Sequence, residues 1–153
     1  MRPSPIPSRT AIAGHPIHPM LIHFPVAALL GLVASDIGFL MTGDTFWARA
    51  SLWLAGVGSL CGWGAGLIGL IDLVSVAQIR RLIAAWSHAL VAVMGLSVVT
   101  LNWLLRLDDM QSWVNPWGLS LSIFTAVLVS LAGILGGQLV YEHGVGVDTE
   151  LDQ

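Results

Sequence analysis

Three histidines alternate with prolines near the start of the chain, in the sequence GHPIHPMLIHFP at residues 14–25. Imidazole is the commonest protein ligand for metals, and it changes its protonation near neutral pH. Proline fixes its own backbone angle and favours an extended conformation in the residue before it. The stretch is therefore a poor helix former, and it predicts a rigid presentation of His15, His18 and His23 to a metal ion or a cofactor.

Three residues elsewhere in the chain extend this set of candidate ligands. Imidazole and carboxylate groups suit zinc, iron or copper. The predicted metal ligands are His15, His18, His23, Asp72, His88 and His143. Each has a simpler interpretation. A single histidine near a helix end can be an amphipathic anchor, and Asp72 can be a carboxylate that reaches water at the membrane interface. A second functional role for Asp72 is to orient an imidazole instead of binding the metal directly.

The elements that must position these residues are membrane-spanning helices. Hydrophobic residues make up 56% of the 153 residues and charged residues only 10%, against about 25% charged residues in soluble domains. A span needs about 20 mostly apolar residues, and backbone in lipid must satisfy its own hydrogen bonds. We predict spans at about residues 20–41, 47–73, 83–105 and 117–141. Short connections make neighbours antiparallel, so the predicted fold is an all-α membrane protein, a four-helix up-down-up-down bundle.

The predicted domains are a flexible N-terminal tail, a four-span membrane domain and an acidic C-terminal tail, at residues 1–13, 14–147 and 148–153. Every histidine then lies on the membrane side that carries the N-terminus. That side also holds more arginines, namely Arg2, Arg9, Arg80 and Arg81 against Arg49 and Arg106. The positive-inside rule therefore places both termini in the cytoplasm. Five histidines on one face favour a functional site over separate anchors.

Depth in the membrane selects two histidines as haem ligands. His23 and His88 lie three and five residues inside the spans that begin at residues 20 and 83, roughly 5–8 Å deep at 1.5 Å per residue. The first and third helices of such a bundle are diagonal partners, and their histidines can ligate one haem iron from both sides. We predict a non-covalent b-type haem on His23 and His88, with His143 as the leading substitute and electron transfer as the function. Arg80 and Arg81 would contact haem propionates or lipid phosphates.

Two alternatives to haem stay open at this point. The same residues could hold a non-haem zinc, iron or copper ion, or the domain could be a ligand-free scaffold for a partner protein. We expect the lipid bilayer and a membrane or periplasmic redox partner as partners, and the net charge of −3 argues against nucleic acid. No catalytic residue is predicted, because the chain lacks a serine nucleophile elbow and paired carboxylates outside its tail. The single cysteine, Cys61, excludes an internal disulfide.

Two further features have mainly structural interpretations. A stripe of small residues, which lets another helix approach closely or could admit a flat porphyrin, is formed by Gly58, Gly62 and Gly66. Asp36 lies deep in the first span, towards the side opposite the histidines. We expect it to pair with Arg49 or Ser51 and to have a structural role.

The opening GHPIHPMLIHFP and the closing GGQLVYEHGVGV at residues 136–147 resemble the membrane family known as domain of unknown function 2231. The resemblance covers residues 14–147 and includes Asp72 after the glycine-rich helix and His88. It implies a four-span domain of the inner (cytoplasmic) membrane and no settled activity. Relatives joined to Rieske-type or cytochrome domains imply redox partners, which adds to the haem interpretation by association only.

Overall fold

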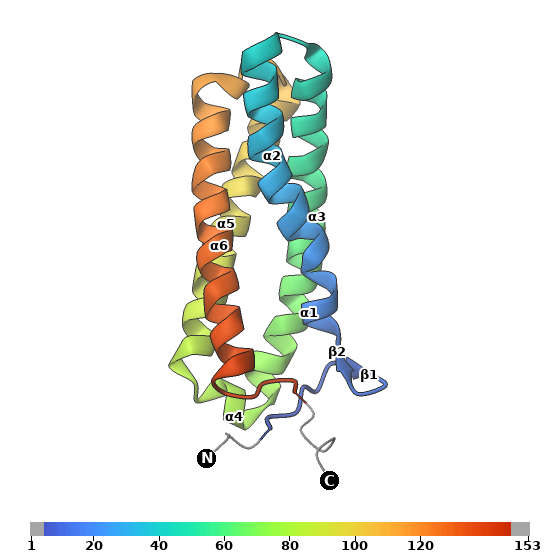
Figure 1. Cartoon of the computed structure of the whole chain (residues 1–153), viewed down its shortest axis with the longest axis vertical. Helices are drawn as coiled ribbons and strands as arrows, with labels where there is room; N and C mark the ends of the chain where they lie inside the picture. Colours follow the sequence, from blue (N-terminus) through green and yellow to red (C-terminus); the bar gives the residue numbers. More distant parts are fainter. Residues whose placement is uncertain (1–4, 148–153) are drawn as a thin grey trace.

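The computed structural model describes residues 5–147, most of which are helical (Figure 1). Four helical segments are long and apolar enough to cross a membrane, namely Ile17–Thr42, Thr45–Ser75, Ile83–Asp108 and Val114–Tyr141. They confirm the predicted all-α, four-span architecture. The first and fourth spans begin three residues earlier than predicted, at Ile17 and Val114 instead of residues 20 and 117.

The first span is made of two helices, α1 (Ile17–Leu21) and α2 (His23–Thr42). Pro25 has no N–H to donate to the carbonyl of Leu21, which accounts for the break between them. The prediction that residues 14–25 make a poor helix was wrong for residues 17–21 in α1 and for residues 23–25 at the start of α2. Pro19 lies in the first turn of α1 and Pro25 in the first turn of α2, where backbone N–H groups have no intrahelical partner to lose. Ahead of α1, strands β1 (Ala11–Ile12) and β2 (His15–Pro16) pair antiparallel.

The other spans follow through short connections. Helix α3 (Thr45–Ser75) is capped at its N-terminus by Asp44, whose side chain accepts a hydrogen bond from the N–H of Phe46. The short helix α4 (Ala77–Arg80) leads into α5 (Ile83–Asp108). The last span combines a π-helical turn, η1 (Val114–Gly118), with α6 (Leu119–Tyr141). The connections hold each long helix antiparallel to the one before it (Figure 1).

The four spans form a ring in chain order. Helix α2 packs on α3, α3 on α5, α5 on α6, and α6 returns to α2. Helices α2 and α5 are therefore diagonal, as are α3 and α6. Figure 1 places α1, α4, the start of α5 and the end of α6 at one end of the bundle, which gathers the histidine-bearing segments there as predicted.

The glycine stripe of α3 serves helix packing. A Cβ atom added at Gly58 would collide with Leu29 of α2, and one added at Gly62 would collide with Leu96 of α5. Leu29 is almost completely buried, in a cluster with Leu32, Ala55 and Val99. Large side chains from two neighbours thus fill the smooth face that could also have admitted a porphyrin.

Residues before the first span contribute to a second apolar cluster. Ile6 packs against buried residues of α3, α4 and α5, namely Leu73, Val76, Ile79 and Ala85. Its N–H donates to the carbonyl of Gly144, and its carbonyl accepts from the N–H of Gly146. Part of the predicted flexible tail therefore packs on the bundle, whereas the domain boundary at residue 14 stays a prediction. The predicted acidic tail at 148–153 lies outside the described residues.

Candidate metal and cofactor site

Two histidine rings lie edge to face between the first and third spans. The ring centres of His18 on α1 and His88 on α5 are 6.1 Å apart, and their planes are 84° from parallel. The Nδ1 atom of His18 lies 2.8 Å from the carbonyl oxygen of Ala65 on α3, and that of His88 lies 2.8 Å from the carbonyl oxygen of Ala132 on α6. Both side chains are half-buried.

These contacts determine which ring nitrogen carries the proton. A carbonyl oxygen only accepts hydrogen bonds, so Nδ1 must be the donor in both rings. The Nε2 atom of each neutral ring then keeps its lone pair. A metal-ligating histidine commonly donates its other N–H to a backbone carbonyl in this way, which fixes the tautomer and the ring orientation.

A glycine on each neighbouring helix makes room for the imidazole. A Cβ atom at Gly69 would lie 3.0 Å from Nδ1 of His18, and one at Gly136 would lie 3.3 Å from Cε1 of His88. Each glycine follows its accepting carbonyl by four residues, one helical turn, so carbonyl and glycine share a face. The two sequences are nearly identical, AGLIG at residues 65–69 and AGILG at 132–136.

This repetition extends to the opposite end of the bundle. His18 lies 18 residues before Asp36, and His88 lies 18 residues before Arg106 (36 − 18 and 106 − 88). Asp36 and Arg106 also contact each other. Two pairs of equivalent residues therefore meet across diagonal spans, as residues do across a twofold axis. A ligand held by both imidazoles would lie on this approximate axis.

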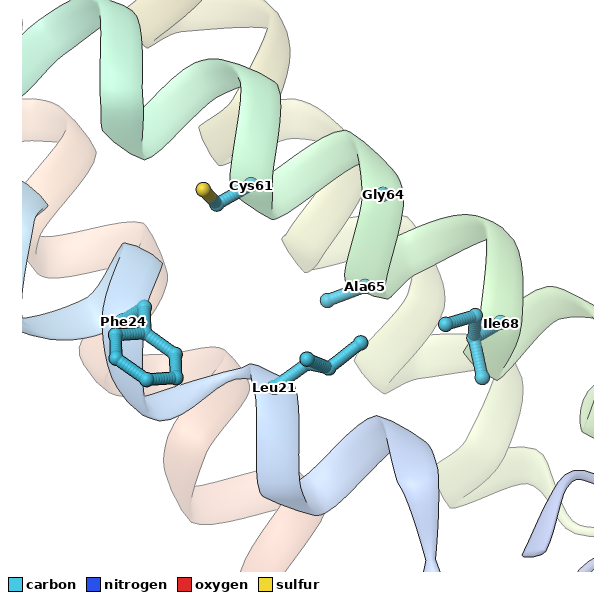
Figure 2. Close-up of a pocket in the computed structure, with 6 residues that line it drawn as sticks. All are labelled: Leu21, Phe24, Cys61, Gly64, Ala65 and Ile68. Carbon is cyan, nitrogen blue, oxygen red and sulfur yellow. The ribbon is translucent and has the colours of Figure 1, made fainter. Parts of the chain in front are cut away.

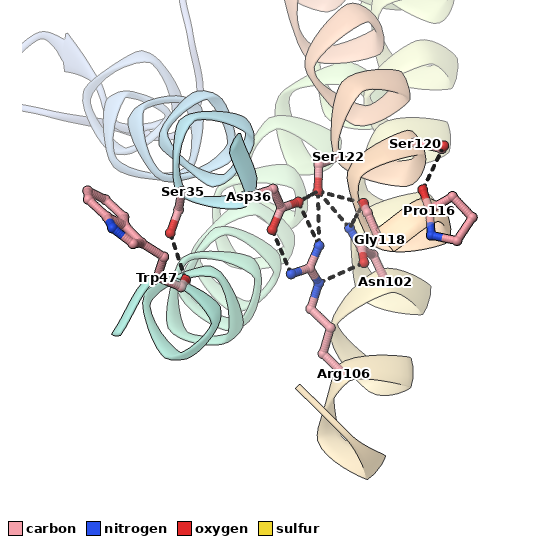
Figure 3. A network of polar contacts seen from close by, with 9 residues as sticks. All are labelled: Ser35, Asp36, Trp47, Asn102, Arg106, Pro116, Gly118, Ser120 and Ser122. Carbon is pink, nitrogen blue, oxygen red and sulfur yellow. Dashed lines mark hydrogen bonds and ion pairs between the residues drawn. The ribbon is translucent and has the colours of Figure 1, made fainter. Parts of the chain in front are cut away.

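The second pair forms a buried ionic network (Figure 3). Nη1 and Nη2 of Arg106 donate to the two carboxylate oxygens of Asp36 at 2.8 and 2.7 Å, and both side chains have no exposed surface. Nε of Arg106 donates to Asn102, and the hydroxyl of Ser122 donates to Asp36. The predicted pairing of Asp36 with Arg49 or Ser51 was wrong. Asp36 faces the bundle interior, whereas Arg49 is exposed.

The carboxylate of Asp72 is hydrogen-bonded to residues 8–10 of the N-terminal segment. It accepts hydrogen bonds from the hydroxyl and the backbone N–H of Thr10, from the N–H of Arg9 and from the hydroxyl of Ser8, at 2.5–2.9 Å. The structure thus gives Asp72 an anchoring role for residues 8–10. Its predicted role as a metal ligand stays a prediction.

The other predicted ligands lie apart from the ring pair. His15 is exposed, and its Nδ1 lies 2.9 Å from the carbonyl oxygen of Ala13. His23 is also exposed, and His143 follows α6 and is half-buried. Within residues 5–147, no group of three or more His, Cys, Asp or Glu side chains is arranged to hold a metal ion. The ring opposite His88 is that of His18, which we had included only among the metal ligands.

Arg80 and Arg81 stand near this end of the bundle. Nη1 of Arg80 donates to the carbonyl of Val74 at 2.9 Å, and both arginines are exposed. This position suits lipid phosphates. Their proposed contact with haem propionates stays a prediction.

Comparison with known proteins supports the resemblance seen in the sequence. Residues 14–149 match the family model described as "Predicted membrane protein (DUF2231)". No curated protein and no solved structure gave a match. Because the family model covers most of the 153 residues, the chain belongs to the DUF2231 family of predicted membrane proteins.

Proposed function

We propose that this membrane domain binds a b-type haem through His18 and His88 and takes part in electron transfer. The observation that carries the proposal is the opposed imidazole pair, with each Nδ1 held by a backbone carbonyl at 2.8 Å. The pair supplies two nitrogen ligands. A haem iron can take two axial ligands from the protein, whereas a bare zinc ion usually takes about four ligands.

The spacing of the rings supports the same ligand. Metal–imidazole bonds are about 2.0–2.1 Å long. The ring centres of His18 and His88 are 6.1 Å apart, a separation at which both imidazoles could reach one metal ion between them. When bound, haem would supply one-electron redox chemistry. The protein would fix both rings and surround them with apolar helices.

An absorption spectrum of the full chain tests the proposal. The protein is expressed with ample haem and iron and purified in detergent. We expect a Soret band that shifts on reduction and disappears in His18→Ala and in His88→Ala. The matched control is His23→Ala, which removes an exposed histidine five residues from His18 and should leave the band unchanged.

The other outcomes distinguish the alternatives. Loss of the band in His23→Ala, with retention in His18→Ala, would contradict the assigned pair and restore the ligands predicted from depth. A colourless protein with stoichiometric zinc, iron or copper would support the second candidate, a non-haem metal site on the same imidazoles. A protein without colour or metal would support the ligand-free scaffold, in which His18 and His88 simply pack edge to face.

We also propose that the histidine end faces the cytoplasm of a cell bounded by an inner membrane, with a membrane or periplasmic redox partner. The arginine distribution supports this orientation. Gln78 on α4 is exposed at the histidine end. In a Cys61→Ala background, Gln78→Cys should react with an impermeant maleimide only after the inner membrane is permeabilised. Reaction in intact spheroplasts would reverse the orientation.

A further inference from the structure

An apolar groove runs along the outside of the bundle where the first span is broken. Leu21 and Phe24 form one wall, and Cys61, Gly64, Ala65 and Ile68 of α3 form the other (Figure 2). Its volume is about 250 Å³, and among the described residues that line it the thiol of Cys61 is the only polar side-chain group. The groove lies beside the ring pair, because the carbonyl of Ala65 holds His18.

Two small residues of this groove are replaced by leucines at the matching positions of the second half of the chain. The repeated pentapeptides differ by 67 in residue number (132 − 65), and the same shift relates Cys61 to Leu128 and Gly64 to Leu131. Leu128 is buried, with 6% of its surface exposed. The second half therefore carries leucines where the first half carries a cysteine and a glycine. A Cβ atom at Gly64 would meet nothing within 4 Å, so the space beside it is open.

The position of the groove defines what can enter it. Its α3 residues lie within the span Thr45–Ser75, and Ile68 is seven residues, about 10 Å along a helix, from the end of that span. In a bilayer this surface faces the hydrocarbon of the leaflet at the histidine end. A lining without hydrogen-bonding side chains other than one thiol suits an alkyl chain and offers nothing to the polar ring of a quinone.

A basic residue lies at the membrane-surface end of the same helix face. Residues 61, 65, 68 and 72 follow one another at intervals of three or four along α3, so Asp72 continues the groove face by one turn. Asp72 holds the backbone N–H of Arg9 at 2.8 Å, and the side chain of Arg9 is exposed. An exposed arginine at this end of the helix face suits the phosphate of a lipid headgroup.

We propose that the groove between α1–α2 and α3 binds one acyl chain of an anionic phospholipid from the leaflet at the histidine end, with Arg9 at its phosphate. This is a binding site separate from the ring pair. The chain fills the open space at Gly64 and covers the thiol of Cys61.

Native mass spectrometry of the full chain tests the site. Protein reconstituted in vesicles of phosphatidylethanolamine and phosphatidylglycerol is extracted in mild detergent, and the bound lipid is identified by mass. We expect one phosphatidylglycerol per chain in the wild type and loss of that lipid in Gly64→Leu, which copies the leucine of the second half. The control is Gly133→Leu on α6, where a Cβ atom also meets nothing within 4 Å; it should retain the lipid. Arg9→Ala should lose the preference for phosphatidylglycerol.

A second readout covers the case in which Gly64→Leu fails to fold. Cys61 is the only cysteine in the chain, so its alkylation by a small maleimide reports on the groove of the unmodified protein. We expect alkylation to slow when phosphatidylglycerol is added back to delipidated protein. Equal lipid retention in wild type and Gly64→Leu, an unchanged alkylation rate, or a retained quinone would overturn the proposal, whatever the result for haem.

Discussion

Equivalent positions at the two ends of the bundle differ in whether their polar atoms have partners within the chain. At the ion-pair end, defined by Asp36, Arg106, Asn102 and Ser122, both carboxylate oxygens and all three guanidinium nitrogens have partners within the chain. At the histidine end, defined by His18 and His88, each ring uses only Nδ1 for a carbonyl. The first end is chemically complete, whereas the second keeps two nitrogen lone pairs.

Under the proposed function, the ion-pair end would contribute mainly to stability and the histidine end mainly to binding. A complete buried network makes the folded state depend on each of its members. Imidazoles fixed through one nitrogen remain able to ligate through the other. The ends are 18 residues apart on each span, roughly 27 Å at 1.5 Å per residue. Changes at one end should therefore add independently to changes at the other.

The largest effect should come from breaking the ion pair. Asp36→Ala leaves the guanidinium group of Arg106 buried without its partner, and the loss of one member of a buried pair costs about 3–5 kcal/mol. The free energy of unfolding in mixed micelles measures this effect. The folded fraction should keep the spectrum of the histidine end, because the two ends do not share contacts.

A double variant provides the control for this experiment. Asp36→Leu with Arg106→Met removes both charges, and replacement of a buried pair by apolar residues is often neutral or stabilising. We expect the double variant to be more stable than Asp36→Ala. A double variant as unstable as the single one would show that packing, and not the unpaired charge, dominates at this end.

At the histidine end, substitution should remove binding with little loss of stability. His18→Ala deletes one hydrogen bond to a carbonyl, a net contribution of about 1 kcal/mol, plus some packing against Gly69. Gly69→Ala keeps the ring but places a methyl group 3.0 Å from its Nδ1, so the ring must shift. We expect Gly69→Ala to lower ligand affinity while unfolding changes little, as measured by ligand titration and denaturation. Unchanged affinity would contradict a fixed ring.

The sequence predicted which helix ends lie together better than it predicted which face of each helix points into the bundle. Counting spans from Met20 onwards correctly gathered the histidines at one end, because apolar length and short connections determine topology. Depth alone then favoured His23 over His18 as the partner of His88. His18 contacts the carbonyl of Ala65 on α3, whereas His23, on the other side of the break in the first span, is exposed.

The sequence did not show how each helix is rotated about its own axis, and therefore which side chains point into the bundle. The first span is apolar on every side, and such a helix shows no polar face that would orient it. The unknown helix rotation also explains why the wrong partner was predicted for Asp36. Arg49 is close to Asp36 in the chain, but its side chain is exposed. The repeated AGLIG and AGILG sequences, together with the equal spacing of His18–Asp36 and His88–Arg106, were the signal that could have identified both pairs.

The buried hydroxyl groups of Ser59 and Thr125 should not stabilise the folded protein. The side-chain oxygens of Ser59 and Thr125 are buried without a hydrogen-bond partner among residues 5–147. A buried polar group without a partner costs about 1–3 kcal/mol. Thr125→Val keeps the shape and removes the hydroxyl, so we expect it to be neutral or to stabilise the protein by up to about 1 kcal/mol. Clear destabilisation in a denaturation experiment would indicate that a water molecule bridges this hydroxyl.

The smallest effect on stability should come from protonation of Asp109 at low pH, in the loop at the ion-pair end. The pKa of Asp109 is lowered by hydrogen bonds from the hydroxyl and N–H of Ser112 and from the N–H of Gln111. A carboxyl group whose pKa is lower in the folded state stabilises the protein above its unfolded pKa, and that contribution is lost as the pH falls through the folded pKa. The stability difference between wild type and Asp109→Asn should therefore be small at neutral pH and shrink as the pH falls below about 4.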